Sequence, residues 1–237
     1  MEEFNRAFID KWKKELDIEL MGAALLGEES PKELREKAMA LLPSARSVVV
    51  MGKELYQEVV SLLEPTRQAG EAEPGELLKV HTDYISGRLN RAVHEMSAHF
   101  RAKGFRSLPL PAKIPTDERF LKALFSFKHA AYLAGLGTIG RHSLLITPEF
   151  GPRVRLACLL TEAPLDPSGV SAQEYCLKCD ACVRACPARA IESRGPDGPY
   201  EVNGFACRAY RQAGMTCAVC MKACSEKIAR HPTGFLV

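Results

Sequence analysis

Four cysteines at fixed spacing, followed by a proline, constrain this chain more than any other feature. Residues 176–187 read Cys-Leu-Lys-Cys-Asp-Ala-Cys-Val-Arg-Ala-Cys-Pro, the pattern C-x2-C-x2-C-x3-C-P. In bacterial ferredoxins this pattern gives three thiolates to one [4Fe–4S] cluster, and its fourth cysteine serves a second cluster. We therefore expect Cys186 to start a helix that points away from the first cluster. The pattern also requires a second group of cysteines elsewhere in the chain.

That second group follows near the C-terminal end as Cys217-x2-Cys220-x3-Cys224, with Cys207 upstream. Pairing in the ferredoxin manner divides eight cysteines between two clusters. The first set is Cys176, Cys179, Cys182 and Cys224; the second set is Cys186, Cys207, Cys217 and Cys220. A zinc site or disulfides are the alternative, but two C-x2-C pairs would satisfy zinc without the third cysteine, the wider gap or the proline. The spacing predicts two [4Fe–4S] clusters.

Cys207 is the least regular of these ligands. A regular ferredoxin repeat would place a cysteine at position 214, where the chain has Gly214, and a proline at position 225, where it has Ser225. Cys158 falls on an alternating apolar stretch and is expected to be a buried structural thiol. Cys207 is then the remaining candidate for the fourth ligand. The open alternative is that Cys207 is a free thiol and this cluster has three irons or an open iron site.

Composition limits the remaining possibilities. A chain of 237 residues with 46% hydrophobic residues supports one large or two modest domains. We expect a cofactor-binding core over 1–165 and a two-cluster module over 166–237. No apolar run reaches the length of a membrane span, and the first residues lack the features of a signal peptide, so a cytoplasmic protein is expected. The formal charge of +3 would become about −1 with two clusters of about −2 each, so nucleic acid is not expected as a partner.

Apolar periodicity predicts alternating helices and strands before the cysteines. Expected helices cover 4–20, 31–42, 54–63 and 119–134, and one more follows His81–Tyr84 and closes at Gly104. Expected strands cover 47–52, 143–147 and 154–160. Ser30 and Pro31 read as a capping box with proline at the first helical position. Residues 64–76 and 193–204 read as loops.

A glycine-rich block lies between the last expected helix and the strands. Residues 134–141 contain G-x-G-x-x-G, which binds dinucleotides when it follows a strand and opens a helix. Here the preceding segment is helical, so a dinucleotide site is not expected. The glycines instead let the backbone approach a flat ligand or a packed neighbour.

Several segments resemble one known superfamily. They are Leu42–Val50, Ala134–Gly140, Leu144–Pro148, Thr161–Leu165 and the two cysteine runs. Over about residues 40–225 the chain resembles the epoxyqueuosine reductase and reductive dehalogenase superfamily. The resemblance implies an α/β (α+β) fold with a nitroreductase-like core that binds cobalamin base-off and a two-cluster ferredoxin module. The implied cofactor-binding residues are Gly135, Gly137, Ile139, Gly140, Ser143, Leu144 and Thr147.

Three departures from the superfamily limit what the resemblance implies about the reaction. Epoxyqueuosine reductases continue into a helical-repeat region that holds transfer RNA, whereas this sequence ends at Val237. Their proposed proton donor is an aspartate about a dozen residues before the glycine block; that position falls near Leu121, and the nearest acids are Asp117 and Glu118. Reductive dehalogenases carry a twin-arginine leader and long insertions that this sequence does not show. The catalytic residues therefore stay unassigned.

Three functions remain open from the sequence. The first is an oxidoreductase that passes electrons through two clusters to cobalamin and reduces a small-molecule or modified-base substrate. The second is an electron-transfer or corrinoid-handling protein that serves another enzyme. The third is a flavin-binding version of the same core. Each function requires an electron donor such as ferredoxin or flavodoxin, and none requires a membrane.

Overall fold

The computed structural model describes residues 3–63, 74–193, 200–213 and 216–230, which form two compact units. The first unit comprises 1–53, 84–136 and 155–172, and the second comprises 54–83, 137–154 and 173–237. The cysteine-rich segment therefore shares a unit with two earlier stretches of the chain. The expected division at 165/166 stays a prediction.

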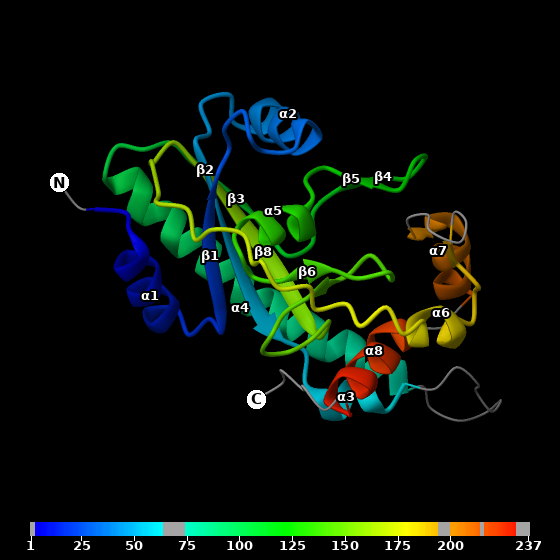
Figure 1. Cartoon of the computed structure of the whole chain (residues 1–237). Coiled ribbons are helices and arrows are strands. Elements are labelled where there is room, and N and C mark those ends of the chain that lie inside the picture. The colour runs from blue at the N-terminus through cyan, green and yellow to red at the C-terminus, as the bar shows by residue number, and fades with distance from the viewer. Residues whose placement is uncertain (1–2, 64–73, 194–199, 214–215, 231–237) are drawn as a thin grey trace. The chain divides into compact units, whose positions relative to one another are not determined.

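A four-stranded sheet in the order β1-β2-β8-β3 organises the first unit (Figure 1). Its strands are β1 (Leu20–Leu25), β2 (Ser47–Glu54), β3 (Ser107–Leu110) and β8 (Val154–Thr161). β1 pairs antiparallel with β2, and β3 pairs antiparallel with β8. The β-branched run Val48–Val50 is fully buried, as expected of a central strand.

Helices cover this sheet through apolar side chains. The helices of the first unit are α1 (Arg6–Glu15), α2 (Lys32–Leu41), α5 (Phe127–Leu133) and the larger part of α4 (Pro74–Ala102). Leu89, Val93, Met96 and Phe100 of α4 are 0% exposed, so their helical spacing does mark the buried face. Gly104, at φ +87, follows the end of α4 as predicted, and the Phe105 amide bonds back to the Phe100 carbonyl.

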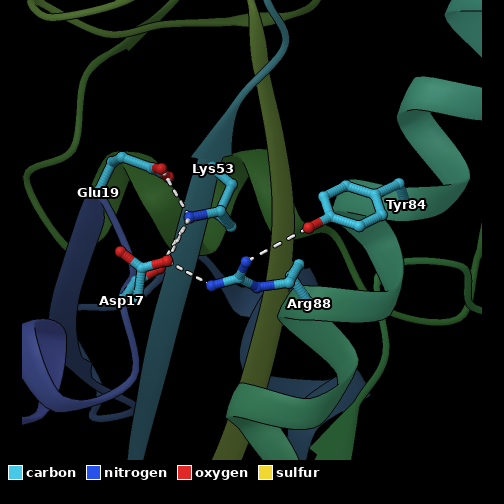
Figure 2. A network of polar contacts seen from close by, with 5 residues as sticks. All are labelled: Asp17, Glu19, Lys53, Tyr84 and Arg88. Atoms are coloured by element: carbon cyan, nitrogen blue, oxygen red, sulfur yellow. Dashed lines mark hydrogen bonds and ion pairs between the residues drawn. The ribbon is translucent and has the colours of Figure 1, made fainter.

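A polar network surrounds the Lys53 side chain near the end of β2 (Figure 2). The ammonium group of Lys53, with its side chain 6% exposed, donates to the Asp17 carbonyl at 2.7 Å and to Glu19 at 2.6 Å. Arg88 of α4 pairs with Asp17 and reaches the Tyr84 hydroxyl. This buried cation is therefore satisfied by partners from the α1–β1 connection.

The second unit consists of short elements. Ahead of the cysteines it has α3 (Gln57–Ser61), the first turns of α4 and the paired strands β6 (Thr138–Ile139) and β7 (Leu145–Ile146). The cysteine-rich part contains α6 (Ala181–Ala185), the hairpin β9 (Ile191–Ser193) and β10 (Tyr200–Val202), α7 (Gly204–Gln212) and α8 (Val219–Ala229). Helices α6 and α8 pack against each other, as Figure 1 shows.

A mixed α/β fold is confirmed, whereas a nitroreductase-like core and a ferredoxin-type module stay predictions. Several expected elements were wrong. The helix expected over 119–134 is confined to 127–133, because β4 (Thr116–Asp117) and β5 (Lys122–Ala123) pair across a turn with Leu121 at φ +52. The helices expected over 4–20 and 54–63 are shorter, and residues 20–25 form a strand.

Three local predictions also need correction. The capping box does not form: α2 begins at Lys32, and the Ser30 hydroxyl donates to the Leu25 carbonyl at 2.8 Å. His81 and Asp83 lie within α4 rather than ahead of it. The expected loops are wrong at their described ends, because α4 begins at Pro74 and Tyr200–Val202 form β10. Residues 64–73 and 194–199 lie outside the described residues, as does Gly214.

No described helix is both long enough and apolar enough to cross a membrane.

Candidate metal centres

The cysteine loop ahead of α6 turns sharply at two residues. Lys178 and Asp180, one on each side of Cys179, have φ values of 51° and 56°. Non-glycine residues visit this left-handed region at a cost, and such residues concentrate at functional sites. The two turns bend the chain around one point, so that thiols three positions apart face the same space.

Four thiols line one pocket of the second unit. Cys176, Cys179 and Cys182 come from the loop and α6, and Cys224 comes from α8. The other lining residues are Arg141, His142, Leu177, Lys178, Asp180, Lys227 and Ile228. The structure thus brings together the four cysteines predicted for the first cluster.

These thiols are close enough to affect one another's ionisation. Burial, together with the neighbouring thiols of Cys176 and Cys179, raises the pKa of Cys182 to about 11. Burial also raises the pKa of Cys224, with Cys182 and Cys176 acting in the same direction. A bound metal would reverse this, because coordination deprotonates a thiol.

The start of the loop is held by residues of the second unit. Glu174 accepts hydrogen bonds from the Thr138 hydroxyl at 2.9 Å and the Cys176 amide at 3.1 Å. The Tyr175 amide donates to the same hydroxyl at 3.0 Å, and the Tyr175 side chain packs with Ile146 and Ile228 beneath Cys176 and Cys224. The strand β6 therefore anchors the first ligand.

Arginines hold the rest of the loop. Arg141 forms an ion pair with Asp180 and donates to the Lys178 carbonyl at 2.9 Å. Arg184 donates to the Cys179 carbonyl at 3.0 Å. Arg141 also keeps the pKa of Asp180 below its usual value through a hydrogen bond. These cations fix backbone carbonyls that surround the thiols.

The second set of thiols also gathers in one place. Cys207 lies on α7, whose first turn is capped by the Asn203 side chain accepting from the Ala206 amide at 3.0 Å. Burial raises the pKa of Cys207, and the thiols of Cys217 and Cys186 contribute in the same direction. Burial raises the pKa of Cys220 to about 12, with contributions from Cys217, Cys207 and Cys186. Cys207 is therefore a neighbour of the other three.

Cys186 does not start a helix, as was expected, but caps the C-terminal end of α6. Its sulfur accepts a hydrogen bond from the Ala190 amide at 3.3 Å. A donor at this position stabilises a thiolate. Cys182 lies in the first turn of α6 and Cys186 at its C-terminal end.

Both sets of thiols consist of cysteine alone. Among the described residues, no group of three His, Cys, Asp or Glu side chains is arranged closely enough to hold one metal ion. Cysteine thiolates are the donors that hold iron–sulfur clusters.

The glycine block follows α5, which agrees with rejecting a dinucleotide site. A Cβ on Gly135, at φ +73, would lie 2.2 Å from the Gly169 carbonyl oxygen, and one on Gly137 would lie 2.1 Å from that of Ile146. Both glycines are thus explained by close contact with the chain's own backbone.

The other residues predicted to bind cofactor form the β6–β7 hairpin. Gly140 and Leu144 close its turn, with Ser143 at φ +63 inside it. The buried Thr147 hydroxyl accepts from the Phe150 amide at 3.1 Å and thereby holds a local turn. Gly137, Ile139, Gly140, Ser143, Leu144 and Thr147 share the second unit, whereas Gly135 belongs to the first. Their contact with a cofactor stays a prediction.

Asp117, one of the two acids nearest the expected proton-donor position, does not suit that role. Asp117 accepts from the backbone and side chain of Arg119, which lowers the pKa of Asp117. Asp117 is therefore ionised at neutral pH and has no proton to donate.

Cys158 is 0% exposed and free, as predicted, and burial raises its pKa.

Four residues of the site were not predicted from the sequence: Arg141, His142, Glu174 and Tyr200. Arg141 and His142 directly follow the glycine block, which was the available signal. Nothing in the sequence links Arg141 with Asp180 or Tyr200, since that proximity arises from the fold.

Comparison with known proteins shows relatives among two groups of reductases. The chain is 35% identical over 115 residues to tetrachloroethene reductive dehalogenase of Desulfitobacterium hafniense, a match covering 40% of this chain and 21% of the dehalogenase. It is 39% identical over 66 residues to epoxyqueuosine reductase of Listeria monocytogenes, covering 28% of this chain and 17% of the reductase. The chain is related to both groups. The predicted resemblance is confirmed.

Solved structures agree on the fold. A reductive dehalogenase whose structure suggests a mechanism for B12-dependent dehalogenation superposes with a TM-score of 0.66 at 21% identity, over 95% of this chain and 32% of that chain. Epoxyqueuosine reductase from Streptococcus thermophilus superposes with a TM-score of 0.57 at 16% identity, over 92% of this chain and 65% of that chain. The chain thus aligns with only part of each relative. No family model matches it.

Proposed function

We propose that this chain is an iron–sulfur reductase that binds two [4Fe–4S] clusters and passes electrons through them to a cobalamin in its core. The observation that carries the proposal is the grouping of cysteines: Cys224 of α8 lines the same cavity as three cysteines of the α6 region. The other four cysteines, Cys186, Cys207, Cys217 and Cys220, belong to the same unit, and Cys217, Cys207 and Cys186 act on the pKa of Cys220, as does Cys182. Two such sets are what two cubane clusters require.

The clusters, when bound, supply one-electron storage and transfer. The chain's own residues hold and tune them. Arg141 and Arg184 fix carbonyls of the first ligand loop, and the Ala190 amide donates to the Cys186 sulfur. Hydrogen bonds to cluster sulfurs and the surrounding charge are what set the potential of such clusters.

Cobalamin is the part of the proposal that rests on relatives. The support is the B12-dependent dehalogenation ascribed to one structural neighbour. The substrate is proposed to be a small organic molecule or a modified base, matching the two groups of relatives. A ferredoxin or flavodoxin is the proposed donor, because both carry single electrons.

A second function, electron transfer or corrinoid delivery to another enzyme, is favoured by the glycine block. Gly135 and Gly137 are accounted for by contacts with the chain's own backbone, so their presence does not require a flat cofactor. Extraction after anaerobic purification separates the two functions. A corrinoid that stays at one per chain when a corrinoid-free acceptor enzyme is added supports the reductase, and a corrinoid that moves to the acceptor supports delivery. A flavin supports a flavin-dependent core. Protein that contains no corrinoid and no flavin supports electron transfer.

Anaerobic reconstitution tests the clusters. The wild-type chain should hold about eight irons and eight sulfides, as two cubanes require. Cys158→Ser should keep all of them, because Cys158 lies outside both sets. Cys207→Ala should lose or convert one cluster and keep the other, as seen by iron content and low-temperature spin quantitation. Zinc at one or two atoms per chain, without sulfide, would overturn the proposal.

A further inference from the structure

The turn of the β6–β7 hairpin presents a buried histidine to the first set of cysteines. His142 is 4% exposed and lines the cavity with Cys176, Cys179, Cys182 and Cys224. Buried imidazoles beside metal centres commonly orient or tune the ligands. The ring of His142 is therefore placed to act on whatever occupies the cavity.

Hydrogen bonding defines which nitrogen of His142 carries the proton. The Leu144 amide donates to Nδ1 of His142 at 3.1 Å. A nitrogen that accepts from an amide holds no proton itself, so the neutral ring carries its proton on Nε2. The turn thus selects one tautomer, with Nε2–H as the donor.

Packing orients the same ring. A Cβ on Gly140 would lie 2.8 Å from Cε1 and 3.2 Å from Nδ1 of His142. The Nδ1–Cε1 edge therefore lies against the backbone of Gly140 and Leu144. The other ring nitrogen, Nε2, is buried, belongs to a residue that lines the cavity, and carries the N–H.

We propose that His142 donates its Nε2–H to a sulfur of the cluster held by Cys176, Cys179, Cys182 and Cys224, and so raises the potential of that cluster. This inference rests on the proposed function, because it requires the cluster. Each reduction adds one electron and one negative charge to the cluster. A hydrogen-bond donor stabilises the added charge, and more so in a buried site.

His142→Phe and His142→Gln test this in the reconstituted full-length chain. Phenylalanine keeps a ring but removes the donor, whereas glutamine restores an N–H donor. A charge-assisted hydrogen bond changes an equilibrium constant by about tenfold, which is about 59 mV for a one-electron couple. We expect His142→Phe to lower the potential of the first cluster by about that amount, and His142→Gln to recover at least half of it.

The potentials are read from redox titrations followed by electron paramagnetic resonance, with the first cluster identified as the signal altered in Cys224→Ser. His81→Gln is the matched control: His81 also accepts a backbone amide, from Tyr56 at 3.1 Å, but does not line the cavity. It should leave both potentials unchanged. Two intact four-iron clusters with unchanged potentials in His142→Phe would overturn the inference.

A second measurement does not depend on the variants assembling a cluster. In wild-type protein labelled with ¹⁵N-histidine, pulsed electron paramagnetic resonance of the reduced first cluster should show coupling to one histidine nitrogen. The absence of that coupling would also overturn the inference. If the wild-type chain contained no iron or sulfide, the proposed function itself would have failed, which iron analysis shows before any potential is measured.

Discussion

The guanidinium carbon of Arg141 lies over the ring of Tyr200, 4.3 Å from its centroid. The same guanidinium pairs with Asp180 and donates to the Lys178 carbonyl. Arg141 therefore ties the hairpin turn and β10 to the loop that carries the first cysteines. Arg141 thus adds to the contacts that Glu174 and Arg184 make with the same loop.

Arg141→Met should weaken retention of the first cluster. The loss of charge-assisted hydrogen bonds is expected to speed iron release to a chelator by about tenfold. Arg141→Lys keeps the charge but not the planar fork, so it should fall between methionine and wild type. Arg189→Met, at an exposed arginine of the same unit, serves as control. Equal release rates for Arg141→Met and wild type would contradict this role.

The buried Lys53 gives a second prediction, about stability. Glu19→Ala leaves the ammonium buried with a reduced set of partners, and should lower the free energy of unfolding by about 3 kcal/mol. Lys53→Met removes the buried charge together with its need for a partner, and should cost about 1 kcal/mol. Urea unfolding followed by circular dichroism measures both. The reverse order would show that Lys53 does not depend on Glu19.

An exposed pair provides the control for that comparison. Lys79 and Glu76 form an ion pair at 3.6 Å with side chains 62% and 60% exposed. Lys79→Met should change the free energy of unfolding by no more than about 0.5 kcal/mol.

The local patterns of the sequence predicted the site better than they predicted the elements around it. Cysteine spacing predicted that Cys176, Cys179, Cys182 and Cys224 come together, and these four line one pocket; their ligation of a cluster stays a prediction. Even the irregular Cys207 lies beside Cys217 and Cys186, as elimination had suggested. Cluster chemistry constrains the spacing of the cysteines, so this spacing can be recognised in the sequence even where the surrounding helices and strands are predicted wrongly.

Helix predictions failed where tertiary contacts replaced local ones. Phe120 and Leu124 have helical spacing with the residues that follow, yet they are 64% and 42% exposed and lie outside α5. The Ser30 hydroxyl bonds to the carbonyl of Leu25, at the end of β1, in place of capping α2. Neither the turn at Leu121 nor the proximity of Ser30 to β1 can be read from a window of sequence.

Glu162 gives a prediction about pH. Hydrogen bonds from Ser44 and from the backbone and side chain of Arg106 lower its pKa from 4.5 to about 2. A lowered folded-state pKa contributes stability above the unfolded pKa and loses it as pH falls toward the folded value. Glu162→Gln should therefore be less stable than wild type at pH 7, and the difference should shrink between about pH 4.5 and pH 2.

Unfolding at a series of pH values measures this difference. Arg106→Met provides the matched partner: because Arg106 donates to Glu162 at 2.9 Å through its side chain, the double variant should cost less than the sum of the two single changes. A difference that stays constant from pH 7 to pH 2 would show that the Glu162 carboxylate does not carry the effect.

Gly137 provides the last prediction, which separates backbone packing from cofactor binding. Gly137 has φ +155, and an added Cβ would lie 2.1 Å from the Ile146 carbonyl oxygen across the β6–β7 hairpin. Gly137→Ala should therefore destabilise the cofactor-free chain by about 2 kcal/mol or more. Gly87→Ala makes the same chemical change on the exposed side of α4, where an added Cβ meets nothing within 4 Å. It should stabilise the chain by about 1 kcal/mol, because alanine is the better helix former. Opposite signs in urea unfolding would confirm that packing requires Gly137. If Gly137→Ala kept wild-type stability and lost only corrinoid binding, the glycine would serve the ligand instead.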